Sequence, residues 1–528
     1  MKHPCRGPCL LLLLMAAGMA GAQAPSKADF DRAFDDTIAR YDLPGLAVGV
    51  VADGKVVYER TAGELEAGSG RKIDRDTLFK IASNSKAMTT GVLARLVDEG
   101  KLAWDDPVVK YLPDFRMHEP WVTREMQVRD LLVHNSGLPA GAGDLMLWPG
   151  PNQFTRADVI HGLRYLKPKY SFRSRYAYDN TLYIVAGEVA AAAGGAPYET
   201  LVRRELFGPL GMDRCQVGEW NRDAVGNVAQ PHMRDDGRYV VSGADEAVVP
   251  NVPMMAAGGI RCSLDDMLKW AAMWLRPEQD GLVGGKPWLS KAQREAVWSP
   301  QTIMPLSARM RAWDGSHYSA YGYGWRLTDV DGTWKVSHTG TLSGMYSALT
   351  LLPEKGAGFV VLINADADDA RTVLTQVLVK QFTAPAQGRT VAFYADELDR
   401  DAEAGQREHP VPDTSSRRPV DAATMGARLG VYRDPWFGDV SICPAGDGVR
   451  FASARSPLMA GEVMRAGDRF LVQWNGRGVD TEPWLDFGEA AGKRTLEMAK
   501  IDPEADFSSD FEDLAFVRTG DCPRGGTE

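Results

Sequence analysis

The spacing of apolar positions changes along the chain and predicts different elements in different stretches. Apolar residues at every fourth position predict a helix over residues 27–41. Two stretches with strand character, Leu46–Ala52 and Lys55–Glu59, then flank Asp53-Gly54, a dipeptide typical of tight hairpin turns. The amino end of the chain is therefore predicted to form a helix followed by a β-hairpin.

Strand patterns return after a long middle region with helical patterns. The apolar runs Tyr346–Pro353 and Gly358–Asn364 predict two strands joined by a short turn. A helical run to Phe382 and a charged, helix-prone stretch, Arg389–Glu408, follow them. Helices segregated from one antiparallel sheet define the α+β class. We expect an α+β domain whose active site lies between the sheet edge and the helical region.

The carboxyl-terminal part of the chain has a different pattern. Residues 409–419 contain three prolines and few apolar residues, which is typical of a linker. From Val420 onward, short apolar stretches alternate with turn residues, which predicts a small antiparallel barrel or sandwich. The expected strands are residues 428–436, 438–446, 448–454, 468–474, 495–501 and 512–518.

The first residues have the pattern of a secretory signal peptide. Lys2 and Arg6 precede the apolar run Cys9–Met19, and small residues follow up to Ala22. The apolar run is too short to span a membrane. We expect cleavage near Ala22 and a periplasmic or secreted mature chain without a stable membrane anchor.

Composition and charge narrow the possible functions. Apolar residues make up 44% of the 528 residues and charged residues 25%, as in ordinary soluble proteins. The net charge of −10 becomes more negative when the basic leader is removed, which argues against nucleic-acid or anionic-lipid partners. The four later cysteines form no Cys-x-x-Cys pair and the eight histidines do not gather near them. We therefore expect neither a metal site nor a cofactor.

Ser83 and Lys86 are the first candidate reactive pair. They are three residues apart at the start of an apolar-periodic run, so a helix would place them on one face with Cβ atoms ~5–6 Å apart. A serine hydroxyl needs a base within hydrogen-bonding reach, and a partly desolvated lysine can serve. The pair Ser69 and Lys72 has the same spacing but lies in a glycine-rich stretch with no helix directly after it. Context therefore favours Ser83 over Ser69. Taken alone, the Ser83 and Lys86 pair is explained equally well by a helix cap with a surface lysine.

Two further short motifs carry polar groups suited to acyl transfer. Tyr178 and Asn180 precede another helical pattern; a phenol can relay a proton and an amide can hold a lysine and a substrate carbonyl. A buried tyrosine and a helix cap would explain the same pair without catalysis. His338, Thr339 and Gly340 follow a strand-like stretch, and glycine there allows close approach to a strand edge.

These residues, in this order, resemble the serine β-lactamase-like superfamily, which includes penicillin-binding proteins and related esterases and peptidases. The class C-like branch has tyrosine-x-asparagine as its middle motif, and the likeness spans Phe30 to Phe382. The resemblance implies a β-lactamase/transpeptidase-like fold. It implies these site residues: Ser83 as the nucleophile; Lys86 and Tyr178 as base and proton relay; His338 as a further catalytic-site residue; Asn180, Thr339, Gly340 and Thr341 as substrate contacts; and the N–H groups of Ser83 and Thr341 as the oxyanion hole.

Three further observations come with the resemblance. Penicillin-binding proteins and class C β-lactamases usually have lysine where this chain has His338, so we expect poor β-lactam hydrolysis. His134 belongs to the family pattern, and we interpret it as fixing a loop. The last strands, Met425 to Arg518, resemble the lipocalin-like domain of some of these hydrolases. Two roles for this domain are open: a barrel that holds a ligand, and an appendage that packs against the rest of the protein. The expected parts are a signal peptide (1–22), a serine β-lactamase-like catalytic domain (23–385), a helical segment with linker (386–420) and a lipocalin-like β domain (421–520).

Four cysteines remain after the expected cleavage, and an oxidising compartment favours disulfides. Cys443 lies on an early barrel strand and Cys522 follows the last one; closure of a small barrel brings such strands together. By elimination, Cys215 would pair with Cys262. Four separate buried thiols are the alternative.

The leading hypothesis is an exported serine hydrolase that forms an acyl-enzyme with an ester, amide or peptide substrate. The main alternatives are a penicillin-binding or β-lactamase-type protein and a non-catalytic binding protein of the same fold. An α/β-hydrolase esterase is disfavoured because the chain has no Gly-x-Ser-x-Gly sequence. The sequence does not name the substrate or the oligomeric state.

Overall fold

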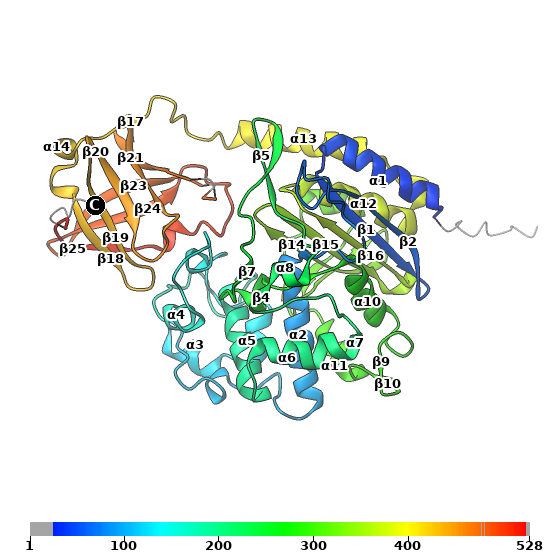
Figure 1. Ribbon diagram of the computed structural model, residues 1–528. Coiled ribbons are helices and arrows are strands. Elements are labelled where there is room, and N and C mark those ends of the chain that lie inside the picture. Colours follow the sequence, from blue (N-terminus) through cyan, green and yellow to red (C-terminus); the bar gives the residue numbers. More distant parts are fainter. Residues whose placement is uncertain (1–24, 477, 480, 524–528) are drawn as a thin grey trace, which may run out of the picture.

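A computed structural model describes residues 25–476, 478–479 and 481–523 of the chain (Figure 1). The expected signal peptide lies outside the described residues. A larger part contains a sheet and most of the helices, and a smaller β part lies beside it (Figure 1). Helix α13 and the extended segment after it lead from the first part to the second (Figure 1).

An antiparallel sheet forms the centre of the larger part, as expected. The predicted hairpin is present, and β1 pairs on its other side with β16, so the two ends of this part of the sequence meet. Its eight strands, in spatial order, are β11 (Thr302–Ile303), β12 (Ser319–Tyr321), β13 (Arg326–Val330), β14 (Thr333–Leu342), β15 (Met345–Leu352), β16 (Ala357–Ile363), β1 (Gly45–Ala52) and β2 (Lys55–Gly63).

Helices cover both faces of this sheet. Strand side chains alternate between the faces, so one strand contributes apolar residues to two cores. Phe359 and Val361 of β16 face a core shared with α1 (Lys27–Tyr41), α12 (Asp368–Thr383) and α13 (Val391–Glu408). These three helices lie together on one side of the sheet (Figure 1). The predicted helix over 27–41 is α1, and a Ser26–Asp29 capping box starts it.

The opposite face of the sheet packs against α10 and a large helical region. Val360 and Leu362 of β16 contribute to this second core, which contains clustered tryptophans such as Trp270 and Trp325. The helices on this side are α2 (Ser85–Asp98), α3 (Pro120–Glu125), α4 (Arg156–Gly162), α5 (Thr181–Gly194), α6 (Tyr198–Leu201), α7 (Gly208–Leu210), α8 (Arg222–Val225), α9 (Met255–Gly258), α10 (Leu264–Leu275) and α11 (Lys291–Val297).

Four short strand pairs join the connections around this region. They are β3 (Phe79–Lys80) with β8 (Arg261–Cys262), β4 (Trp220–Asn221) with β7 (Val248–Val249), β5 (His232–Asp235) with β6 (Arg238–Val241), and β9 (Leu282–Val283) with β10 (Lys286–Pro287). The β3–β8 pair matters for the site because Phe79–Lys80 leads directly into the turn that carries Ser83.

The carboxyl-terminal part is a closed antiparallel barrel. Eight strands follow one another around it, and pairing of β21 with β22 closes the ring, while β17 adds to the outside of β21. The strands are β17 (Arg418–Pro419), β18 (Gly430–Asp434), β19 (Gly438–Ala445), β20 (Gly448–Ser453), β21 (Ala460–Ala466), β22 (Arg469–Trp474), β23 (Pro483–Ala490), β24 (Lys493–Lys500) and β25 (Phe516–Gly520); a short helix, α14 (Ala422–Met425), precedes β18.

Three barrel strands are additional to the sequence-based expectation. Strand β23 contains Pro483 and Gly488, which are typical of turns, so its sequence does not predict a strand. Gly461 interrupts the apolar pattern of β21. Strand β17 lies at the end of the expected linker, so the pairing of the barrel begins before residue 420.

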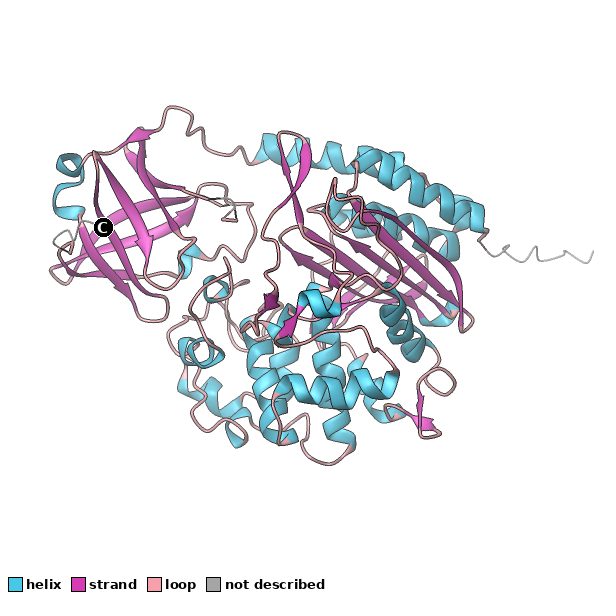
Figure 2. Cartoon of the chain, viewed as in Figure 1, coloured by secondary structure: helices cyan, strands magenta, loops and turns pink. Residues whose placement is uncertain are grey.

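The barrel lies beside the helical region of the larger part (Figure 2). The rings of Phe154 and Phe437 lie 5.7 Å apart, and one apolar core includes both residues. An ion pair joins Arg455 of the barrel to Asp158 of α4, with Nη2 and Oδ2 2.7 Å apart. Apolar packing together with an ion pair fixes the barrel beside the helical region.

The structure contains two disulfide bonds, in the pairing that the sequence favoured. Cys215 is joined to Cys262, and their Cα atoms lie 4.2 Å apart. Cys443 on β19 is joined to Cys522, which follows β25, with Cα atoms 5.7 Å apart. The first and last barrel strands, β18 and β25, pair with one another, and this closure brings the second pair of cysteines together.

The described residues contain neither a membrane-spanning helix nor a cluster of metal-ligand side chains. No helix in the described ranges is long and apolar enough to cross a membrane. The same part of the chain contains no group of three or more His, Cys, Asp or Glu residues arranged to hold a metal ion.

Candidate active site

Ser83 lies in a tight turn between β3 and α2. The turn is a 3₁₀ segment, Ala82–Asn84, and α2 begins only at Ser85, so Ser83 precedes the α-helix instead of lying within it. Ala82 has φ 47°, in the left-handed region that non-glycine residues rarely adopt. Such local strain is typical of functional sites that the surrounding packing holds in place.

Strand β14 packs closely against this turn at Gly340. A Cβ atom on Gly340 would lie 2.1 Å from the carbonyl oxygen of Ile81 and 2.3 Å from Ser347 Oγ, so a larger residue would displace the turn. The sequence suggested that glycine here admits substrate; the structure shows that it admits the chain's own Ser83 turn. Thr341 follows on the same strand, and its hydroxyl accepts a hydrogen bond from Arg371 of α12 at 2.8 Å.

Lys86 is fully buried, and its Nζ contacts three oxygen atoms. These are Ser83 Oγ at 3.0 Å, Asn180 Oδ1 at 2.7 Å and the carbonyl oxygen of Ala257 at 2.9 Å. Burial lowers the pKa of Lys86 to about 7, against the opposing effect of Asp144. A neutral amine has two N–H donors and one lone pair. Asn180 and Ala257 can take the two donors, and the Ser83 hydroxyl can donate to the lone pair.

Asn180 connects Lys86 to a buried carboxylate. Its Nδ2 donates to Asp144 Oδ2 at 2.8 Å, which assigns Oδ1 as the acceptor facing Lys86. Asp144 is completely buried, and burial raises its pKa well above the usual value. Oδ1 of Asp144 is buried and has no hydrogen-bond partner among the described residues. No sequence pattern selects Asp144, because it belongs to no motif and lies in a loop.

Tyr178 lies over the Lys86 amine, with Nζ 4.9 Å from the ring centre. Burial raises the pKa of Tyr178 to about 12, while Arg326 and a hydrogen bond with Ser83 work against the rise. At neutral pH the side chain is therefore a phenol that can both donate and accept a hydrogen bond.

His134 fixes the loop that carries Tyr178, as the sequence analysis expected. Its Nδ1 accepts a hydrogen bond from the Asp179 N–H at 3.1 Å, and its ring lies 4.3 Å from that of Tyr178. Its backbone has φ 56°, and Ser136 in the same loop donates to Asp179 at 3.1 Å. Burial lowers the pKa of His134 well below its usual value, so the ring is neutral and acts as an acceptor.

His338 is buried, and both of its ring nitrogens have hydrogen-bond partners. Its Nδ1 lies 2.7 Å from the Thr339 carbonyl oxygen, and its Nε2 lies 2.8 Å from the Tyr321 hydroxyl. Burial first, and the charge of Arg326 second, lower its pKa well below the usual value. The carbonyl can only accept, so Nδ1 carries the proton and Nε2 accepts from Tyr321. His338 is therefore a neutral ring in a fixed tautomer.

Arg326 is a site residue that the sequence analysis missed. Its Nη1 donates to Thr339 Oγ1 at 2.7 Å, and it is partly exposed. Its charge lowers the pKa values of Lys86 and Tyr178. Arg326 comes from β13, whose pairing places it opposite Ser337, one residue before His338. Only that pairing, which no local pattern reveals, could have identified it.

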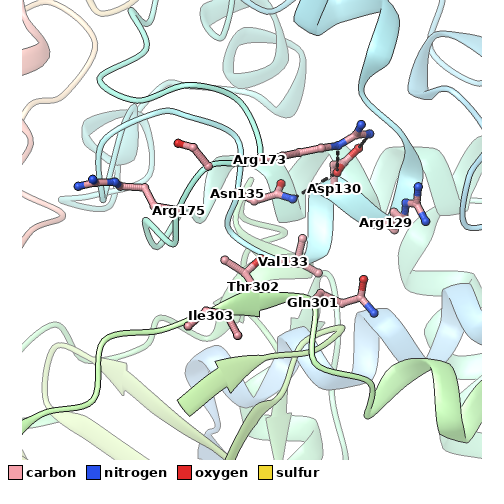
Figure 3. A pocket seen from close by; sticks show the side chains of 10 residues that line it. Arg129, Asp130, Val133, Asn135, Arg173, Arg175, Gln301, Thr302 and Ile303 are labelled. Carbon is pink, nitrogen blue, oxygen red and sulfur yellow. Dashed lines mark hydrogen bonds and ion pairs between the residues drawn. The ribbon is translucent and has the colours of Figure 1, made fainter. Parts of the chain in front are cut away.

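A surface depression lies beside these residues and does not include Ser83. It has a volume of about 370 Å³ and is lined by basic side chains, Asp130 and residues of β11. Figure 3 shows Arg173 paired with Asp130, while Arg175 extends away from that pair. Val133 and Asn135 of its wall flank His134, so the depression adjoins the loop behind the site.

Comparison with known proteins identifies the family. The Beta-lactamase family model matches residues 30–383, which is more than half of the chain. This chain belongs to the Beta-lactamase family, whose serine hydrolase type agrees with the arrangement around Ser83. The expected β-lactamase/transpeptidase-like fold is thereby confirmed.

Relatives with assigned names extend this result. Unguisins hydrolase ungD' from Aspergillus campestris (strain IBT 28561) is 27% identical over 436 residues, covering 79% of this chain and 78% of that protein. Penicillin-binding protein 4 from Amycolatopsis lactamdurans is 26% identical over 340 residues, covering 64% of this chain and 85% of that protein.

A solved structure has a similar fold over nearly the whole chain. The octameric penicillin-binding protein homologue from Pyrococcus abyssi covers 93% of this chain and 99% of its own, with a TM-score of 0.58 and 19% identity. At that identity the similarity concerns the fold alone.

Proposed function

We propose that this chain is an exported serine hydrolase that forms a covalent acyl-enzyme on Ser83. The observation that carries the proposal is the contact of Lys86 with Ser83, at 3.0 Å, by an amine whose pKa is about 7. A general base is most effective when its pKa lies near the working pH. The family and the hydrolase name of one relative support turnover over simple binding.

The proposed reaction begins when neutral Lys86 takes the Ser83 proton. Ser83 Oγ attacks the substrate carbonyl, and the N–H groups of Ser83 and Thr341 stabilise the oxyanion. Lys86 returns the proton to the leaving group through Tyr178. The phenol of Tyr178 lies beside the Lys86 amine and Ser83. The bond to the leaving group breaks, and water then releases the acyl group by the same steps in reverse.

The substrate we propose carries a carboxylate next to the bond that is cleaved. Arg326 and the Thr339 hydroxyl form a cationic, hydrogen-bonding pair at the edge of β14. Guanidinium groups bind carboxylates in a bidentate manner, so this pair supplies the fixed positive charge that neutral His338 lacks. Amide, peptide and ester substrates with a carboxylate all suit this geometry.

Acylation by β-lactams without rapid hydrolysis is a second candidate function. It is supported by the similarity to penicillin-binding protein 4 and by neutral His338 in the position where lysine is usual. We expect slow or undetectable hydrolysis of penicillins. A kcat/KM near 10⁷ M⁻¹s⁻¹, within the range of efficient enzymes, would contradict this expectation.

Covalent labelling tests the main proposal. A fluorophosphonate probe should add to the peptide that contains Ser83, and Ser83→Ala should abolish labelling. Ser69→Ala is the matched control, because Ser69 has the same spacing to a lysine but lies in an exposed turn. Labelling at Ser69, or labelling that survives Ser83→Ala, would refute the assignment.

Export is proposed on the leader pattern and the two disulfides. Disulfide bonds persist in oxidising compartments such as the periplasm. Mass spectrometry of the protein from cell fractions should find a mature amino terminus after Ala22 outside the cytoplasm. An intact Met1 in a cytoplasmic fraction alone would contradict export.

A further inference from the structure

One loop of the barrel reaches the residues around Lys86. It joins β24 to β25 and covers residues 501–515. Three residues near its tip, Phe507, Ser508 and Asp510, contact the catalytic region. The hydrogen bonds of Ser508 and Asp510 cross between parts of the chain that are more than 350 residues apart in sequence.

Asp510 anchors the loop. Its buried carboxylate accepts hydrogen bonds from the N–H of Gly143, at 2.6 Å, and from the N–H of Leu145, at 3.0 Å. These two residues flank Asp144 in the chain. Two backbone N–H groups thus donate to the two oxygen atoms of one buried side chain, which fixes the loop to this turn.

Ser508 contacts the network of the site directly. Its hydroxyl donates to Asp144 Oδ2 at 2.8 Å, and the same oxygen accepts from Asn180 Nδ2. Asn180 in turn accepts from Lys86. A continuous series of hydrogen bonds therefore runs from the barrel loop to the amine beside Ser83.

Phe507 presents an aromatic ring beside Tyr178. The two ring centres lie 5.6 Å apart in an edge-to-face arrangement, and 40% of Phe507 is exposed. Its backbone packs against Gly141, where an added Cβ would lie 2.3 Å from the Phe507 carbonyl oxygen. A half-exposed aromatic ring on an anchored loop, next to a tyrosine of the site, is suited to contact a ligand.

We propose that the β24–β25 loop forms one wall of the active site and that Phe507 limits the bulk of the acyl group accepted there. The inference rests on the proposed function, because it assumes acylation of Ser83. Arg326 and Thr339 bind the carboxylate of the leaving group on the side of the sheet. The acyl group then lies on the opposite side of the site, which Phe507 and Asn180 border. Ser508 and Asp510 are positioning residues that hold the ring in place.

The test compares two esters that share a carboxyphenyl leaving group, one with an acetyl and one with a phenylacetyl group. The measured quantity is the ratio of their kcat/KM values, phenylacetyl over acetyl, with the full mature chain. Phe507→Ala should raise this ratio about tenfold, the scale on which an apolar pocket discriminates by size. Phe507→Trp should lower the ratio, which keeps the test informative if the alanine variant folds poorly.

Phe393→Ala is the matched control. Phe393 is also 40% exposed but lies on α13, where its ring contacts Tyr394. Its replacement should leave the ratio unchanged. If Ser83 of the unmodified chain is labelled and the Phe507 variants have the ratio of the Phe393 control, the inference is wrong while the proposed function stands. If the unmodified chain neither labels at Ser83 nor cleaves either ester, the proposed function fails and this inference fails with it.

Discussion

Two stretches of this chain have a serine three residues before a lysine, and the two lysines differ in burial and in contacts. Lys86 is buried, contacts Ser83 and two further oxygens, and has a pKa lowered to about 7. Lys72 has 72% of its side chain exposed and pairs with Glu64 at 2.9 Å. Its partner in the pattern, Ser69, is exposed in a turn.

The difference shows that burial, more than spacing, makes a lysine a base. Removal from water disfavours the ammonium form of Lys86, and the helical region supplies acceptors for a neutral amine. Lys72 stays in water and forms an ion pair with Glu64. The same four-residue pattern is thus a candidate reactive centre at one place and a surface ion pair at the other.

Replacing Lys86 by alanine should have the largest effect on the reaction rate, whereas replacing Lys72 should have none. Lys86→Ala should lower the rate of Ser83 labelling and of ester cleavage by about 10²–10⁴, the scale of a lost general base. Lys72→Ala, measured in the same assay, should leave both rates unchanged. Equal effects of the two changes would remove the distinction that burial is proposed to make.

Removing the charge of Arg326 should have the next largest effect. Arg326→Ala is expected to raise KM for a carboxylate-bearing ester about 10–100-fold, as for loss of a charged hydrogen bond, and to spare the matching ester without a carboxylate. Arg175→Ala is the control, since that arginine is exposed and lies over the Tyr170 ring at 4.5 Å. An equal rise for both esters would assign Arg326 to structure alone.

The barrel disulfide should affect stability more than chemistry. Replacing Cys443 and Cys522 together by serine opens a long loop, and the free energy of unfolding of the barrel should fall by about 2–4 kcal/mol. Denaturant unfolding followed by tryptophan fluorescence measures this change. The Ser83 site should keep at least part of its probe reactivity in the absence of denaturant, and complete loss there would contradict the separation of the two regions.

His338 should give the smallest effect on acylation. His338→Gln should change the rate of Ser83 labelling by less than about tenfold, because the Nδ1 proton is donated to the Thr339 carbonyl and Nε2 already accepts from Tyr321. Labelling kinetics measure the effect. A loss as large as that from Lys86→Ala would instead make His338 part of the proton path.

The sequence revealed the site residues that belong to short motifs and left Arg326 and Asp144 undetected. Ser83 lies in the turn just before α2, Lys86 lies in its first turn, and Asn180 directly precedes α5, so local patterns brought out these positions. Arg326 reaches the site through strand pairing, and Asp144 through a loop with no regular pattern. Contacts of that kind depend on tertiary packing, which no short window of sequence contains.

The fold shows the same limit. The helix α1, the hairpin β1–β2 and the strands β15 and β16 follow from clear periodicity and strong turn residues. Strand β23 begins with Pro483 and contains Gly488, so its sequence resembles a turn until its pairing partner is known. The approach of the barrel loop to Gly143 depends on how two parts of the chain dock, which their separate patterns do not encode.

The pH dependence of Ser83 labelling tests the central claim most directly. Neutral Lys86 is the proposed base, so the rate should rise with pH and level off above a midpoint near the pKa of about 7. The same profile with Lys86→Ala should lack this midpoint, while Lys72→Ala should retain it. A midpoint near the ordinary lysine value of about 10.4, or an unchanged profile in Lys86→Ala, would contradict the account.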